Sequence, residues 1–341
     1  WELVAKKRLE VADARDEQFE KLMALRVQIA ANAGFKDYRE FKHISKGRFD
    51  YQPDDCFKFH EAVETLVMPL YNQLLSERRE SMQLNALRPW DTGVDPLGRA
   101  PLKPFTEVDD MVTRTKNIFN HVDDELAGGF QIMRDQNLLD LANRKGKAPG
   151  GYQSSLPEAR LPFIFMNAVG VHGDVQTLLH EGGHAFHVFE SAALPWTMQR
   201  EVGMEFAEVA SMAMELLAAP YLAERDGGFY SDEEAARARG EHLERSLLFW
   251  PYMAVVDGFQ HWAYTHPQAA AQPAECDAAW LDLWLRFHPH LDWSGFEDYV
   301  ATGWHNKLHL YHVPFYYVEY GMAQPGAVQV LSRIHIRRCR R

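Results

Sequence analysis

The segment from Thr177 to His187 constrains the fold most, because it places two histidines four residues apart. It reads Thr-Leu-Leu-His-Glu-Gly-Gly-His-Ala-Phe-His. On an α-helix, His180 and His184 project from the same face, one turn apart, where two imidazoles can hold one zinc ion. Glu181 then stands beside the metal and can take a proton from a zinc-bound water, whose pKa zinc lowers to about 7. The segment is therefore predicted to be a helix carrying a zinc hydrolase motif.

The competing interpretation is that two histidines share a helical turn by chance, since the chain contains 16 histidines. Gly182 and Gly183, however, each cost a helix roughly 0.8–1 kcal/mol relative to alanine. A local cost of this kind next to two candidate ligands is typical of a functional site. The glycine pair therefore favours the zinc interpretation.

A third protein ligand is needed if one zinc position is to stay open for water. Glu190 lies six residues after His184, a spacing at which one large class of zinc peptidases places its third ligand. In that class a glycine three residues after the second histidine stops the helix, but His187 occupies this position here. If the helix continues, the Glu190 side chain points roughly 80° away from the face that carries the two histidines. Glu208 and Glu215 are better candidates, because they share one face of the next predicted helix. One of them can bind the metal while the other orients a histidine.

Long helical segments with one β-prone interval predict a mainly α fold. Residues 138–171 have Gly and Pro turns between short β-prone runs, which predicts a small sheet of two or three strands beside the active-site helix. Pro162 suits an edge strand at 160–167, which could bind an extended peptide by strand addition. A buried core strand fits Phe163, Phe165 and Met166 equally well. Helices are expected at 1–35, 53–87, 174–193, 204–226, 232–265, 275–288, 294–309 and 314–331.

The charge balance excludes several classes of function. The chain has 36 Lys and Arg against 48 Asp and Glu, a net charge of −12. This acidity argues against a nucleic-acid binder, and the apolar runs are too short for a membrane span. The three cysteines are widely spaced and form neither a disulfide framework nor a CxxC zinc site. They favour a reducing, cytoplasmic location.

Three motifs in this chain together match the pattern of a known family. They are His180-Glu-Gly-Gly-His184, Glu208-Val-Ala-Ser-Met212 and Tyr311-His-Val-Pro-Phe-Tyr-Tyr-Val-Glu-Tyr320. With them, most of residues 30–330 resembles the thimet oligopeptidase and oligoendopeptidase F family of zinc peptidases, in particular the bacterial oligoendopeptidase F branch. The resemblance implies a mainly helical, zincin-like fold around a channel that admits short unstructured peptides.

The same resemblance assigns the metal site. It implies one zinc ion per chain, held by His180, His184 and Glu208, with Glu181 as the general base. It also implies that the chain is a fragment, because members of the family have a further helical lobe before the first residue here and more helix after about residue 331. We expect one catalytic domain over residues 1–332, followed by a basic segment, 333–341, that is foreign to it.

By resemblance, the segment around residues 304–320 contacts the substrate. We expect Tyr320 to donate a hydrogen bond to the developing oxyanion and His312 to take part in catalysis. His309 and Tyr317 are expected to bind the substrate. An alternative interpretation is that these aromatic side chains pack in the hydrophobic core.

A second interpretation of the same segment is a further metal site. His305, His309 and His312 have the spacing of one helical face, although Pro314 argues against a continuous helix there. The expected function is thus a zinc metallo-endopeptidase that hydrolyses oligopeptides. The alternatives are a peptide- or zinc-binding fragment without turnover, and another zinc hydrolase such as a carboxypeptidase.

Overall fold

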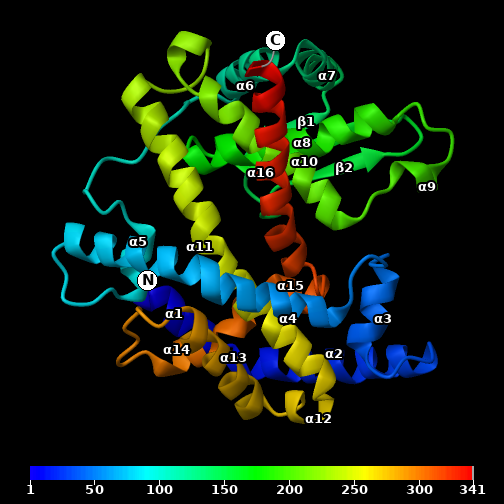
Figure 1. The fold of residues 1–341 in the computed structure, drawn as a ribbon, viewed down its shortest axis with the longest axis vertical. Helices are drawn as coiled ribbons and strands as arrows, with labels where there is room; N and C mark the ends of the chain where they lie inside the picture. The colour runs from blue at the N-terminus through cyan, green and yellow to red at the C-terminus, as the bar shows by residue number, and fades with distance from the viewer. Residues whose placement is uncertain (340–341) are drawn as a thin grey trace. The chain divides into compact units, whose positions relative to one another are not determined.

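The chain divides into two compact units, each containing two stretches of sequence. The computed structural model describes residues 1–339, of which 335–339 are described as backbone only. Unit 1 comprises residues 1–99 and 246–321, and unit 2 comprises residues 100–245 and the chain from Met322 onward. Two long helices, α11 (Asp232–Thr265) and α16 (Tyr317–Cys339), contribute residues to both units. The predicted mainly helical fold with a small sheet is confirmed (Figure 1).

Two sequence features of the whole chain can be compared with this structure. None of the described helices is both long and apolar enough to cross a membrane. The basic segment 333–341 continues α16 as far as Cys339, and its last two residues lie outside the described chain. The prediction that this segment is foreign to the domain stays a prediction.

The regular elements of unit 1 are all helices in its described residues. Its N-terminal stretch contains α1 (Glu2–Leu9), α2 (Ala12–Asn32), α3 (Tyr38–Ser45), α4 (Pro53–Ala62), the π-helical turn η1 (Val63–Val67), α5 (Met68–Ser81) and the short η2 (Pro89–Gly93). Its second stretch continues from α11 through α12 (Pro267–Ala270), α13 (Pro273–Phe287), α14 (Glu297–Ala301), η5 (Thr302–Asn306) and α15 (Leu308–His312) into α16. Buried aromatic rings fill its interior, with Phe19 and Trp304 4.8 Å apart between ring centres.

Two predicted helices of unit 1 are broken in the structure. The segment 1–35 forms α1 and α2 instead of one helix, although no Gly or Pro marks the break. Trp1 packs edge-on against Trp90 and Phe296, so tertiary contacts hold α1 in its own direction. The segment 294–309 is likewise interrupted at η5, where a Cβ on Gly303 would lie 2.6 Å from the Trp280 indole nitrogen.

Unit 2 combines a helical layer with a small sheet. Its described elements are α6 (Val108–Val122), α7 (Asp124–Asp135), β1 (Leu139–Ala142), β2 (Tyr152–Leu156), β3 (Leu161–Ala168), α8 (His172–Ser191), α9 (Thr197–Arg200), α10 (Met204–Ala218), η3 (Ala219–Tyr221) and η4 (Glu224–Asp226), with parts of α11 and α16. The strand order is β1-β3-β2, with β1 parallel and β2 antiparallel to β3. The predicted small sheet beside the motif helix is therefore confirmed, with three strands.

The prediction that Pro162 marks an edge strand is wrong, because β3 is the central strand. The Ile164 amide donates to Leu138 on the β1 side of β3, and Pro162, two residues earlier, turns its nitrogen to the same side. Register pairing with β1 begins only at Ile164, so the missing N–H of Pro162 interrupts no ladder bond. The two edge strands of the sheet are β1 and β2.

The core of unit 2 lies between the motif helix α8 and the sheet. Ile164 and Met166 of β3 are buried together with Val175, Leu178 and Leu179 of α8. Burial of the apolar side of α8 against the sheet fixes which side of the helix remains for polar residues. His180 and His184 lie on that remaining side.

Candidate metal centre

The first turn of α8 is held by a carboxylate. Asp174 Oδ2 accepts hydrogen bonds from the backbone amides of Val169, Gly170 and Val171, at 2.8, 2.8 and 3.0 Å. These donors belong to the N-cap residue and the two residues before it, so the bonds hold the incoming chain against the helix start. The negative charge also suits the positive end of the helix dipole. Gly170 is left-handed, with φ +89°, and packs so closely that a Cβ would lie 2.9 Å from the Phe105 carbonyl.

The glycine pair of the motif allows two helices to approach closely. A Cβ on Gly182 would lie 2.6 Å from the Phe119 ring, and a Cβ on Gly183 would lie 2.6 Å from backbone atoms of both Ala210 and Ser211. The second contact is with the backbone of α10, which cannot move aside as a side chain can. Gly183 lowers the stability of the helix, but it allows α10, which carries Glu208, to pack directly against α8.

The structure brings the predicted ligands together. One donor atom each from His180, His184 and Glu208 lies within 4.8 Å of the others. Both Nε2 atoms face the same carboxylate oxygen, Glu208 Oε2, at 3.2 Å from His180 and 3.6 Å from His184. Two imidazole nitrogens and one carboxylate oxygen are a ligand set typical of catalytic zinc, which leaves a fourth position open.

A second carboxylate orients the first histidine. Glu215 Oε1 lies 2.7 Å from His180 Nδ1, so the Nδ1 side of the ring is engaged and Nε2 is left for a metal. The other oxygen of Glu215 lies 2.9 Å from Nε2 of His242, on α11. Ser211 donates to Glu208 Oε2 at 3.0 Å. The residues alone left open which acid binds and which orients; in the structure Glu208 lies among the three candidate donor atoms, and Glu215 lies behind His180.

The charges around this cluster suit a cation. Burial lowers the pKa of His180, but hydrogen bonds to Glu208 and Glu215 outweigh burial and raise it to about 10. Burial likewise raises the pKa of Glu208, yet the two histidines hold it well below its usual range. Two ionised carboxylates thus draw positive charge to the point where the three donor atoms converge. The residues present fit a zinc ion there.

Glu181 stands beside the ligands and is itself buried, with 7% of its surface exposed. Burial raises its pKa above the usual range, although the neighbouring His180 and His184 oppose this. A backbone hydrogen bond from Gln153 in β2 also reaches the carboxylate. A raised carboxyl pKa suits a general base that must take and return a proton near neutral pH.

Glu190 does not join the cluster. The α8 helix continues without interruption to Ser191, and Glu190 is exposed near its end. His187, at the position where the competing class has its glycine, is half-buried on the same helix. The structure therefore agrees with the sequence argument against Glu190.

Comparison with known proteins identifies the family. The model of peptidase family M3 matches residues 1–338. The chain belongs to this family. No curated protein matches the chain.

Several solved structures are similar to this M3 chain. A protein described as an oligoendopeptidase F shares 31% identity with a TM-score of 0.89, over 97% of this chain and 57% of that one. PZ peptidase A, solved with an inhibitor, shares 33% identity with a TM-score of 0.87, over 95% of this chain and 57% of its own. A protein from Bacillus anthracis str. Ames, also described as an oligoendopeptidase F, shares 29% identity with a TM-score of 0.82, over 97% and 56%. This chain thus spans little more than half the length of these relatives.

The expected substrate residues of the M3 chain lie in unit 1, and three of them cluster. The ring of His309 lies 4.9 Å from that of Tyr317 and 6.1 Å from that of Tyr320, between ring centres. Tyr317 is buried and its hydroxyl accepts a hydrogen bond from Lys307 at 2.7 Å, while His312 is exposed. The substrate and oxyanion roles of these four residues stay predictions.

The alternative metal site at His305, His309 and His312 is not formed. The segment is divided into η5 and α15, so the three residues do not share one helix. His305 is buried, and its Nε2 lies 2.6 Å from Asp16 Oδ1. The doubt raised by Pro314 about a continuous helix is confirmed.

Three residues near the candidate metal centre were not predicted from the sequence. His242 lies on α11, and it reaches Glu215 only through the packing of that helix in unit 2.

 Because His242 belongs to none of the motifs, only the folded chain shows that it pairs with Glu215, the acid behind His180. Ser211 and Gln153 are common polar residues without any distinguishing pattern. Ser211 does fall inside the Glu208-Val-Ala-Ser-Met212 motif, and this was the one available signal.

Proposed function

We propose that the chain is the catalytic part of a zinc-dependent M3 endopeptidase that hydrolyses short unstructured peptides. The observation that carries the proposal is the convergence of His180, His184 and Glu208 within 4.8 Å, with the buried Glu181 next to two of them. The names of the similar solved structures, oligoendopeptidase F and PZ peptidase A, support peptides as the substrate class.

Each group of the centre has a task in this proposal. His180, His184 and Glu208 would hold one zinc ion, which acts as a Lewis acid and makes water more acidic when it is bound. Glu181 takes the proton of the attacking water and returns it to the departing amine, as a buried carboxylate of raised pKa is suited to do. Glu215 keeps His180 in the orientation that presents Nε2.

The substrate side of the proposal rests on the resemblance. Tyr320 donates to the oxyanion, His312 takes part in catalysis, and His309 and Tyr317 bind the peptide. Burial raises the pKa of Tyr317, so its phenol keeps its proton at neutral pH. The Lys307 contact orders this hydroxyl at 2.7 Å. The uncharged phenol of Tyr317 is therefore a hydrogen-bond donor that can bind a peptide carbonyl.

The sheet offers a second element for peptide binding. β2 is an edge strand that pairs with β3, and the backbone of its Gln153 reaches Glu181. An extended peptide can add to such an edge by main-chain hydrogen bonds. We assign this role to β2, in place of the strand at 160–167. A cytoplasmic location is also part of the proposal, because both described cysteines are free and buried.

The experiment is the variant Glu181→Gln, assayed with fluorogenic peptides of graded length and with casein. Zinc content is expected to stay unchanged while peptide hydrolysis falls by roughly 10²–10⁴-fold, the usual contribution of a general base. Glu190→Gln, an exposed acid of the same helix, is the matched control and should keep full activity. Undiminished hydrolysis by Glu181→Gln would remove this residue from the mechanism.

The same assay separates the alternatives. Release of single C-terminal residues would favour a carboxypeptidase, and zinc binding without any cleavage would favour a non-catalytic fragment. Cleavage within short peptides but not within casein is the expected result for an endopeptidase of unstructured substrates.

A further inference from the structure

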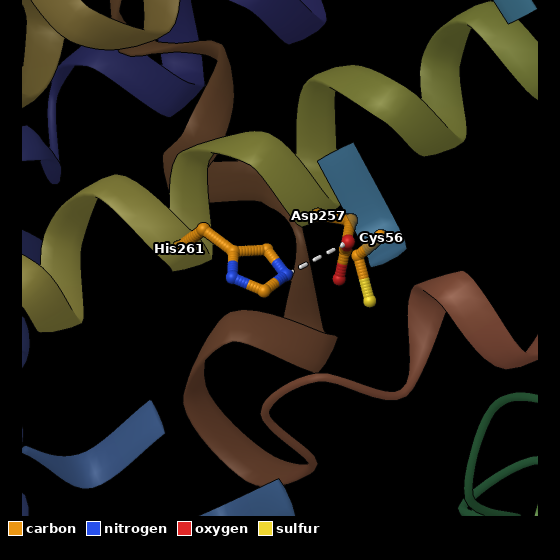
Figure 2. A group of neighbouring side chains, drawn as sticks. All are labelled: Cys56, Asp257 and His261. Atoms are coloured by element: carbon orange, nitrogen blue, oxygen red, sulfur yellow. Dashed lines mark ion pairs between the residues drawn. The ribbon is translucent and has the colours of Figure 1, made fainter. Parts of the chain in front are cut away.

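A second cluster of ligand-type side chains lies in unit 1, outside the centre described above. Cys56 comes from α4, and Asp257 and His261 come from α11. One donor atom each from these three residues lies within 4.8 Å of the others. Figure 2 shows the His261 ring and the Asp257 carboxylate side by side, with Cys56 next to them. We propose that these three residues bind a second zinc ion.

The two helices are built to present these side chains together. Asp257 and His261 are four residues apart on α11, and so lie on one face, one turn apart. On α4, Cys56 and His60 have the same spacing. Two helical faces with ligand residues one turn apart thus meet at one point in the core of unit 1.

His261 has the unsatisfied polar atoms expected of a metal ligand. Only 2% of its surface is exposed, and neither ring nitrogen makes a hydrogen bond to any described residue. Its Nε2 lies 3.2 Å from Asp257 Oδ2, but without the geometry of a hydrogen bond. A buried polar atom without a partner carries a desolvation cost, which coordination of an ion removes.

Asp257 provides the charge for the same ion. It is fully buried, and its Oδ1 has no hydrogen-bond partner among the described residues. Burial raises the pKa of Asp257, but His261 and His60 outweigh this and keep it ionised. His60 Nε2 lies 3.0 Å from Oδ2, which leaves Oδ1 for the metal and makes His60 a positioning residue.

Cys56 completes a mixed set of sulfur, nitrogen and oxygen ligands. Its surface is 1% exposed and it forms no disulfide. Burial and the nearby Asp257 raise the pKa of its thiol, so it carries a proton in the metal-free protein and would release that proton to solvent when the sulfur binds the ion. Thiolate, imidazole and carboxylate together are a ligand set that zinc accepts and that magnesium or calcium does not.

An entry path leads to this cluster. His60, Gly258 and His261 line a pocket of about 400 Å³, together with Phe57 and Trp262. The pocket is large enough for a hydrated ion, and it reaches His261, one of the three proposed ligands, and the positioning residue His60. A buried site with such a path can be loaded and emptied in the folded protein.

The test replaces zinc by Co²⁺, because a thiolate bound to cobalt gives a charge-transfer absorption in the near ultraviolet. Fully reduced protein is stripped of metal, reloaded and analysed for cobalt per chain. The wild-type chain is expected to bind two ions and to show the thiolate band. Cys56→Ser is expected to lose one ion and the band, while Cys276→Ser, a second buried free cysteine of unit 1, keeps both.

Two further variants guard against a folding defect. Asp257→Asn should also lose one ion and the thiolate band, with an unchanged far-ultraviolet circular dichroism spectrum. Glu208→Ala should lose the other ion and keep the band, which separates this proposal from the proposed function. One ion per wild-type chain without a thiolate band, or a band that survives Cys56→Ser, would overturn the second site.

Discussion

The two clusters of candidate ligands, one in each unit, differ in exposure and in their order along the chain. The histidines of the candidate centre in unit 2 keep 21% and 15% of their side-chain surfaces exposed, whereas the side chains of His261 and Asp257 are 3% and 0% exposed, and Cys56 is buried. A zinc site that performs chemistry needs an open position, and a structural site is closed. We therefore expect catalysis at the more exposed cluster of unit 2, whereas an ion at the proposed site of unit 1 would be shielded from bulk solvent.

The largest expected effect is a loss of metal binding at one site that leaves the other site unchanged. Glu208→Ala removes one of three ligands and should weaken metal binding in unit 2 by more than about a hundredfold, because even an orienting partner contributes ten- to a hundredfold. Metal titration followed by dialysis and elemental analysis would measure this. Glu205→Ala on the same helix is the control and should keep the ion. Full zinc occupancy in Glu208→Ala would contradict the ligand assignment.

Next in size are the two positioning residues. Glu215→Gln removes the charge behind His180, and His60→Gln removes the partner of Asp257. Each is expected to weaken the ion of its own unit by roughly ten- to a hundredfold and to leave the other ion unaffected. Cobalt titrations resolve the two sites, because only one of them gives the thiolate band. A change in both sites from either variant would break the assignment of one positioning residue to each ion.

Gly183→Ala should act on unit 2 by an intermediate amount. Its Cβ would lie 2.6 Å from the α10 backbone, so the helices must separate, at a cost of about 1–3 kcal/mol in the free energy of unfolding. Metal affinity in unit 2 should fall with it. Urea unfolding of Gly183→Ala and of the control Gly173→Ala, which has open space around its Cβ, would measure the difference. Equal stability of the two variants would show that the close approach is dispensable.

The smallest effect compares one buried histidine from each unit. His172 and His288 each place Nδ1 within hydrogen-bond distance of a tyrosine hydroxyl, at 2.7 and 2.6 Å. Burial lowers the pKa of His172 to about 4 and that of His288 to about 3. Both must stay neutral in the fold, so stability is complete above about pH 6.5, the unfolded pKa, and is lost as the pH falls toward the folded values.

Each histidine should therefore cost about 1 kcal/mol of unfolding free energy between about pH 7 and 5.5. Urea unfolding at the two pH values would measure this loss. His172→Asn and His288→Asn preserve a hydrogen-bonding group near the Nδ1 position and should each reduce the acid sensitivity by that amount. An unchanged pH dependence in both variants would mean that other groups control acid unfolding.

The candidate centre of unit 2 could be named from the sequence because its information is local. His180, Glu181 and His184 are contained in one helical turn, and Glu208 lies in a second short motif on the next helix. The family, the mainly helical fold and the small sheet were confirmed, since strong helical periodicity and clustered Gly and Pro residues are readable without tertiary contacts.

The remaining features depend on contacts between distant segments. Neither the break between α1 and α2 nor the central position of β3 has a local marker, because Trp1 packing and β1 pairing decide them. The cluster of Cys56, Asp257 and His261 could not be predicted from the sequence for the same reason. A single cysteine and an Asp-x-x-x-His pair on another helix are common patterns, and only the fold brings them together.

The spacing of the ligands along the chain also has a consequence for folding kinetics. His180 and Glu215 are separated by 35 residues, whereas His60 and Asp257 are separated by 197. Loops of such different length close at different entropic cost, and contacts between near neighbours form first. We expect the hairpin of α8 and α10 to acquire its ion early in refolding and the thiolate site to load late. The order in which the two cobalt spectra develop after dilution from denaturant would reveal this sequence of events.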